Sequence, residues 1–176
     1  ISRGLVGSEM CIRDRLEAAY PIKFREWSLR QDSGGVGENR GGLGAVYEIE
    51  LLEEEAKAFI FGERSKFAPP GVVGGGDGAL NKFSYEHQNE FKSPPLASKM
   101  VNISLFKGQA VRLETPGGGG YGKACKRKID SVLNDVKLEY ISTALASSEY
   151  GVVINDEGEV DERKTFASRE KIRQTR

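Results

Sequence analysis

Apolar and polar residues alternate in several short runs, and a period of two predicts strands. The predicted strands cover residues 22–29, 45–52, 58–61, 96–106, 110–115 and 152–154. In the first run the even-numbered positions face one side and the odd-numbered positions face the other. The first two runs flank a glycine-rich loop, which predicts an antiparallel pair. Residues 83–95 are polar with scattered aromatic residues, and we expect a loop there.

Helical spacing is confined to the last third of the chain. Ile129, Val132, Leu133 and Val136 recur with the period of a helix. Ser142 is a suitable cap for a second short helix over 143–149. The segment 161–176 is charged, which predicts an exposed helix or a frayed end. We therefore predict an α+β fold rich in β structure, with antiparallel sheets, long Gly-rich loops and a short C-terminal helical pair.

The strand and helix patterns also predict which side chains are buried. These are Phe24, Leu29, Val46, Ile49, Leu51, Phe59, Phe61, Ile103, Val111, Leu113, Leu133, Val136, Val153 and Ile154. Truncating one of them to alanine is expected to cost about 2–5 kcal/mol.

The loop after the first strand is unusual, because six of the eleven residues from Gly34 to Gly44 are glycine. One interpretation is that the backbone takes positive φ there or comes close to a ligand or another chain. Polar residues in or beside the loop, such as Asp32, Ser33 and Arg40, would then be held at a site. The other interpretation is a hairpin connection rich in turn residues.

Two further glycine runs resemble nucleotide-binding motifs only in spacing. Gly74-x-Gly76-x-x-Ala79 has the spacing of a dinucleotide fingerprint, but no amphipathic helix follows it. The run from Gly117 to Lys123 has phosphate-loop spacing, but Ala124 stands where a Ser or Thr hydroxyl would hold magnesium. We therefore expect the second run to be a tight crossing of the backbone, with Tyr121 as an anchor.

Composition narrows the possible functions. A length of 176 residues suits one domain or part of a larger one. The net charge is zero, so neither nucleic acid nor an anionic membrane is indicated as a partner. Cys11 and Cys125 form no disulfide framework, which favours the cytoplasm. His87 has no histidine or cysteine near it in sequence, so we predict no metal site and assign His87 to a surface loop.

The beginning of the chain differs in character from the rest. Residues 1–15 look like translated adapter sequence, and we expect this segment to be non-native. The alternative is a native helix fragment.

Seven motifs, in this order, resemble one known family. They follow Tyr20-Pro21 and are Leu29-Arg30-x-Asp32-Ser33-Gly34-Gly35-x-Gly37, Arg40-Gly41-Gly42-x-Gly44, Phe67-x-Pro69-Pro70-Gly71, Gly74-Gly75, Glu114-Thr115-Pro116-Gly117-Gly118-Gly119-Gly120-Tyr121-Gly122, Tyr150-Gly151-Val152-Val153-Ile154 and Gly158-Glu159-Val160-Asp161. Together they look like the carboxy-terminal part of the hydantoinase B/5-oxoprolinase family. The resemblance covers about residues 16–164, and residues 165–176 are expected to form a charged tail. The chain departs from the family at Lys123-Ala124, where the family usually continues with Asp-Pro.

The resemblance implies a subunit of an ATP-dependent cyclic-amide hydrolase of the N-methylhydantoinase B or 5-oxoprolinase type. ATP would be bound by a hydantoinase A-type ATPase partner, and the substrate would be a hydantoin or 5-oxoproline. The family's metal-binding segment lies upstream, so a divalent metal would belong there and no cofactor is assigned to this chain. The alternatives are a ketone carboxylase subunit of the same family and a non-catalytic β-rich binding module.

The resemblance supplies no catalytic residue within this chain, so the predicted site is limited to residues that shape it. These are Asp32, Ser33, Gly34, Gly35, Arg40, Gly41, Gly42, Gly118, Gly119 and Tyr121.

Overall fold

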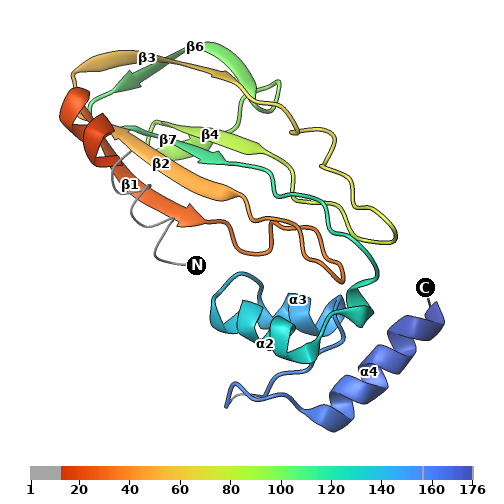
Figure 1. Cartoon of the computed structure of the whole chain (residues 1–176). Coiled ribbons are helices and arrows are strands. Elements are labelled where there is room, and N and C mark those ends of the chain that lie inside the picture. The colour runs from red at the N-terminus through yellow and green to blue at the C-terminus, as the bar shows by residue number, and fades with distance from the viewer. Residues whose placement is uncertain (1–12, 156, 176) are drawn as a thin grey trace. The chain divides into compact units, whose positions relative to one another are not determined.

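The computed structural model describes residues 13–155 and 157–175 and is drawn in Figure 1. The chain divides into two compact units, each assembled from three separate segments. The first unit takes the described residues up to Ser28, together with Val46–Glu63 and Lys82–Glu114. The second takes Leu29–Ala45, Arg64–Asn81 and the described residues from Thr115 onward. Neither unit is therefore a continuous stretch of sequence.

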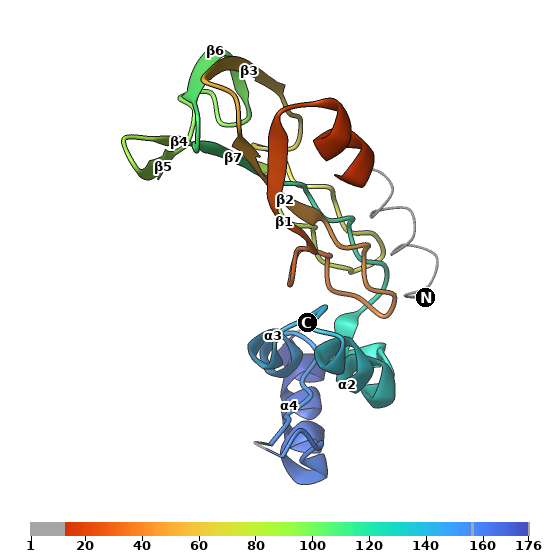
Figure 2. The same cartoon turned by 90° about the vertical axis from the view of Figure 1, so that its left-hand side faces the viewer.

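Two sheets make up the first unit. The larger sheet has the order β1 (Ile22–Leu29), β2 (Ala45–Leu51), β7 (Ala110–Glu114), β4 (Lys82–His87) and β5 (Glu90–Lys92). The smaller sheet pairs β3 (Glu55–Phe61) with β6 (Lys99–Phe106), and these two strands run side by side in both views (Figures 1 and 2). The pairs β2–β7, β4–β7, β4–β5 and β3–β6 are antiparallel.

The predicted hairpin of the first two strands is present. Leu52 N–H donates to Pro21 O at one end, and Arg30 N–H donates to Gly44 O at the other, both at 2.8 Å. Residue numbers rise along β1 while those of its partners on β2 fall, so β1 and β2 are antiparallel. The glycine-rich loop therefore connects neighbouring strands, as the pattern predicts.

The core of the first unit lies between its two sheets. The buried side chains there are Leu51, Phe83, Ile103 and Leu105. The inward residues of β3 and β6, such as Ala58 and Ile60, pack against them. Burying one such large side chain contributes about 1.5–3 kcal/mol. The smaller sheet therefore covers the apolar face of the larger one.

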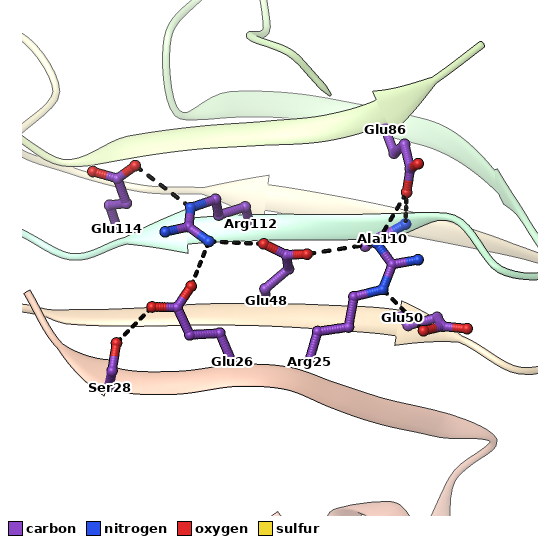
Figure 3. A network of polar contacts seen from close by, with 9 residues as sticks. All are labelled: Arg25, Glu26, Ser28, Glu48, Glu50, Glu86, Ala110, Arg112 and Glu114. Atoms are coloured by element: carbon purple, nitrogen blue, oxygen red, sulfur yellow. Dashed lines mark hydrogen bonds and ion pairs between the residues drawn. The ribbon is translucent and has the colours of Figure 1, made fainter. Parts of the chain in front are cut away.

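Strand β1 departs from the predicted strict alternation. Phe24 and Trp27 stack with ring centroids 4.9 Å apart, and Trp27 meets Tyr47 edge-on at 4.7 Å. The side chains of Arg25 and Glu26, which are adjacent in sequence, both join one polar network (Figure 3). The alternation therefore shifts by one residue between these positions, as a bulge does.

The second unit contains the helices. They are the short 3-10 helix η1 (Ala124–Lys126) and the α-helices α2 (Ile129–Lys137), α3 (Thr143–Ser148) and α4 (Glu162–Thr175). Val132, Ile141, Ala146, Tyr150 and Val152 form their buried core. The predicted cap of α3 is confirmed, because Ser142 Oγ accepts a hydrogen bond from Leu145 N–H at 3.1 Å. The α+β class with antiparallel sheets and short C-terminal helices is confirmed.

Three residues expected in the core are exposed. They are Leu29 at 47%, Phe59 at 59% and Phe61 at 74% of full exposure. Ala58–Phe61 reads as a wholly apolar run, but β3 has only one side packed, and that side takes Ala58 and Ile60. Phe24, Val46, Leu51 and Ile103 are buried as predicted. The remaining members of the predicted core are half-buried: Ile49, Val111, Leu113, Leu133, Val136, Val153 and Ile154.

Several element boundaries also differ from the predictions. The segment expected to be a loop at 83–95 contains β4 and β5, and His87 is the exposed last residue of β4. The strand predicted at 152–154 is reduced to one bridge between Ile154 and Val160, because a turn reverses the chain between them. Residues 13–19 are helical, whereas residues 1–12 of the segment expected to be non-native lie outside the described residues.

Candidate functional site

Most of the predicted site residues lie in a structure that we call the glycine core, formed by residues 33–44, 69–79 and 116–122. All three segments belong to the second unit. Backbone hydrogen bonds join them directly. Gly35 N–H donates to Gly118 O at 2.8 Å, Gly118 N–H donates to Gly42 O at 2.9 Å, and Gly120 N–H donates to Gly76 O at 2.9 Å. Stretches far apart in the sequence are thus held together by backbone atoms.

Most of these glycines are needed because a side chain would not fit between the segments. A Cβ atom on Gly35 would overlap the carbonyl oxygen of Gly76, and one on Gly41 would overlap that of Gly118. None of the glycines from Gly34 to Gly44 has a positive φ. The expectation of positive φ is therefore wrong, and the reason observed is one that the sequence analysis did not name for this loop, close approach of the backbone to other segments of the same chain.

Asp32 and Ser33 fix the ends of the first segment. Asp32 has a positive φ of 58°, and its Oδ1 accepts a hydrogen bond of 2.7 Å from Ser142 N–H at the start of α3. The Ser33 hydroxyl donates to Arg30 O at 2.5 Å and accepts from Gly44 N–H at 2.8 Å. Because Ser33 is buried and its hydroxyl is committed in both directions, it is placed to hold the loop rather than to act as a nucleophile.

Arg40 lies in a buried charge cluster with Asp135 and Arg127. Arg40 Nε lies 3.3 Å from Asp135 Oδ2, and Arg127 Nη2 lies 2.8 Å from the same oxygen. Arg40 also donates to Gly41 O at 2.8 Å, and its guanidinium lies 5.2 Å from the centre of the Tyr140 ring. A buried carboxylate held by two guanidiniums is costly to break by removing one partner. Arg40 therefore connects the glycine core to α2.

Tyr150 lies beside this cluster and is fully buried. Burial raises the pKa of its phenol, and the backbone of Gly37 and the charges of Arg127 and Arg40 oppose that rise. The Tyr150 hydroxyl and the Arg127 Nε–H are buried without a hydrogen-bond partner among the described residues. Such groups are the usual positions for an internal water molecule.

The third segment of the core does not form a phosphate loop. The amide groups of Gly118, Gly120 and Gly122 donate to backbone oxygens of the two other segments, so they are not directed at a ligand. The segment is followed by the three-residue helix η1 and not by a long helix. Tyr121 exchanges two backbone hydrogen bonds with Asn39, at 2.9 and 3.0 Å, while its side chain is exposed. The anchoring predicted for Tyr121 thus comes from its backbone.

A second group of polar residues lies on the larger sheet of the first unit, and we call it the polar ladder (Figure 3). It contains Arg25, Glu26, Ser28, Glu48, Glu50, Glu86, Arg112 and Glu114. Arg112 Nη1 lies 2.6 Å from Glu26 Oε2 and 2.7 Å from Glu48 Oε2. Arg25 Nε lies 2.9 Å from Glu50 Oε2. Two guanidiniums thus tie four neighbouring strands together through carboxylates.

The ladder lowers the pKa of two of its carboxylates, those of Glu26 and Glu50. The hydrogen bond from Ser28 and the contact with Arg112 lower the pKa of Glu26. The hydrogen bond from Arg25 lowers the pKa of Glu50. The same contacts with Glu50 raise the pKa of Arg25. The sequence analysis did not identify this ladder, although like-spaced glutamates and arginines on predicted neighbouring strands were a signal for it.

The first unit also contains an apolar cavity of about 300 Å³. Its walls include Leu16, Phe24, Trp27, Tyr47 and Phe59. A cavity of this size can take a small apolar group. None of its lining residues carries a charge, so the cavity itself offers no group for acid–base chemistry.

No group of three or more His, Cys, Asp or Glu side chains in the described residues is arranged to hold a metal ion. Cys125 is buried and His87 is exposed at the end of β4. The predicted residues are brought together as a backbone scaffold. The partners that the sequence analysis missed, Asp135, Arg127 and Tyr150, were hidden because they lie about 90 residues or more from the loop they hold.

The fold and its glycine core define an α+β chain in which three glycine-rich segments are joined to one another by backbone hydrogen bonds. The family model described as Hydantoinase B/oxoprolinase matches residues 12–124. The chain belongs to the Hydantoinase B/oxoprolinase family, which confirms the resemblance drawn from its motifs.

Three matches, two of them to the caprolactamase of one organism, sharpen the comparison. Caprolactamase subunit beta of Pseudomonas jessenii is 34% identical over 158 residues, which is 88% of this chain and 27% of that protein. The crystal structure of the ATP-dependent caprolactamase from Pseudomonas jessenii matches with a TM-score of 0.76 and 33% identity, over 90% of this chain and 28% of that one. A nucleotide-free acetone carboxylase structure matches with a TM-score of 0.80 over 93% of this chain and 26% of that one, at 21% identity, so it shows the fold alone.

The chain spans about a quarter of the length of these relatives. None of the helices in the described part of the chain has the length and apolar character that crossing a membrane requires.

Proposed function

We propose that this chain is part of the B-type subunit of an ATP-dependent enzyme that opens cyclic amides, and that it serves there as a scaffold. The observation that carries the proposal is the 34% identity to a caprolactamase beta subunit over 88% of the chain. The acetone carboxylase shares the fold at only 21% identity, so the sequence favours amide opening over ketone carboxylation.

The role as a scaffold follows from the chemistry of the described residues. Asp32, Ser33 and Arg40 are all engaged in contacts within the chain. The backbone of the glycine core is fixed by hydrogen bonds between its own segments. The groups that act on the substrate would therefore come from the remaining part of the subunit. ATP would be bound and hydrolysed by a hydantoinase A-type partner, and a divalent metal would be held outside this chain. The site-shaping role of Gly34, Gly35, Gly41, Gly42, Gly118, Gly119 and Tyr121 is part of the same proposal.

The test uses the full-length subunit, produced together with its A-type partner. ATP-dependent ring opening is measured with hydantoin, 5-oxoproline and caprolactam, and acetone with bicarbonate serves as the comparison. We expect opening of at least one cyclic amide and no turnover by this chain alone, with or without ATP. Carboxylation of acetone without any amide opening would assign the complex to the ketone carboxylases, and turnover by the isolated chain would refute the scaffold role.

A further inference from the structure

We call the outward side of the smaller sheet the outer face of β3–β6. It presents Phe61, Val101 and Phe106, which are 74%, 49% and 53% exposed. Charged residues share this face, since the register pairs Glu55 with Phe106 and Phe61 with Lys99. Single exposed apolar residues need no explanation, but two phenylalanines and a valine exposed on one small sheet mark a surface that packs against something.

This face is not needed for packing inside the described chain. The inward residues of the same strands, including Ala58, Ile60, Ile103 and Leu105, already pack against the larger sheet. Neither β3 nor β6 has a second strand neighbour among the described residues. The smaller sheet is thus a layer with one side occupied and one side open.

The comparisons show how much of a related polypeptide lies outside this segment. In two solved structures, this fold is about a quarter of one polypeptide, with 26% and 28% of those chains covered. About three quarters of such a polypeptide lies outside the present segment and has to pack somewhere. Large apolar side chains suit a permanent contact, whereas transient contacts between subunits are more polar.

We propose that in the full-length protein the outer face of β3–β6 is covered by an apolar surface from another part of the same polypeptide. The inference rests on the family membership and on the exposed residues. It does not depend on which substrate the enzyme opens.

The test measures whether position 61 is covered in the folded full-length subunit. Phe61→Cys and Phe91→Cys are made separately in a background whose native cysteines are replaced by alanine. Phe91 is a matched control, because it lies in β5 of the same unit, outside the face, and is 45% exposed in this chain. The rate of reaction with a soluble thiol reagent is measured without partner, substrate or ATP.

We expect the cysteine at 61 to react about tenfold or more slowly than the one at 91, since a covered position reacts only through local opening. Equal rates would overturn the proposal. Protection that arises only when the A-type partner is added, or that increases with protein concentration, would assign the face to another chain and would also overturn it. Phe106→Cys provides a second position on the face if Phe61→Cys folds poorly. An inactive enzyme with a protected position 61 would contradict the proposed function alone.

Discussion

At the scale of single residues, the glycines of the core are not equivalent. Gly41 is buried, and a side chain there would meet the backbone carbonyl of Gly118, which cannot move without breaking the core. Gly42, its neighbour, is exposed, and an added Cβ would meet nothing within 4 Å. Of these two adjacent glycines, Gly41 therefore has a steric reason to be glycine, whereas Gly42 has none.

This difference predicts opposite effects of the same substitution. Gly41→Ala is expected to lower the free energy of unfolding of the full-length subunit by about 1–3 kcal/mol or more, because the methyl group overpacks against backbone. Gly42→Ala is expected to leave stability unchanged or raise it by about 0.4–1 kcal/mol, because alanine has less freedom in the unfolded chain. Urea unfolding of the two variants checks the prediction. Equal losses of stability would show that Gly42 is also enclosed.

Arg40 offers a second test at this scale. Arg40→Ala leaves Asp135 with Arg127 as its remaining guanidinium partner, so we expect a loss of about 1–3 kcal/mol in stability. We also expect lower activity of the full-length complex, because the glycine core loses its tie to α2. Thermal unfolding and steady-state kinetics are compared with those of Arg163→Ala, a change at an exposed position in α4. Unchanged stability and kinetics for Arg40→Ala would show that Arg40 contributes neither to the scaffold nor to the site.

At the scale of elements, one side of the larger sheet carries the ion pairs and hydrogen bonds of the polar ladder in place of apolar packing. Strands β1, β2, β4 and β7 each contribute a carboxylate, and β1 and β7 contribute the arginines (Figure 3). A single exposed ion pair contributes little to stability. In a network, each side chain is held by several partners, so the entropy lost in fixing it is shared among several ion pairs. The ladder is therefore the part of the first unit that is most sensitive to protonation.

The ladder predicts loss of stability in acid. The pKa of Glu26 is lowered in the folded chain, so its contribution is present at neutral pH and is lost as the pH falls through that lowered value. We expect the free energy of unfolding to decrease between about pH 5 and pH 3, the range in which carboxylates titrate. Glu26→Gln should flatten this dependence, whereas Glu90→Gln, at an exposed position of β5, should not. Equal slopes for both variants and the original chain would contradict the role of the ladder.

At the scale of the whole molecule, the sequence predicts where the strands and helices lie better than it predicts which of their side chains are buried. The period of two located most strands, the helical spacing located α2 and the Ser142 cap located α3, because these signals are local. The alternation of Phe83 and Tyr85 with Ser84 and Glu86 was also present in the sequence, and reading the segment as a loop overlooked it. The exposure of Phe59 and Phe61 could not be predicted, because composition alone does not say how many sides of a strand are covered.

The candidate site shows the same limit. The motifs gave the family and the residues of the glycine core, because glycine runs are visible in any sequence. Their function within the fold depends on contacts between residues 33–44, 69–79 and 116–122, and on Asp135, none of which is close in sequence. No local pattern carries that information, so the structure was needed to find that these residues mainly hold one another.

The glycine core has a consequence for how such proteins diversify. A region built from backbone atoms offers almost no side chains that mutation can alter, and most replacements there damage the fold before they change anything else. Positions such as Gly42, where an added side chain meets nothing, can still change. Differences in substrate between related enzymes should therefore arise mainly at positions whose side chains are free to vary, and a comparison that seeks the origin of specificity can leave the enclosed glycines aside.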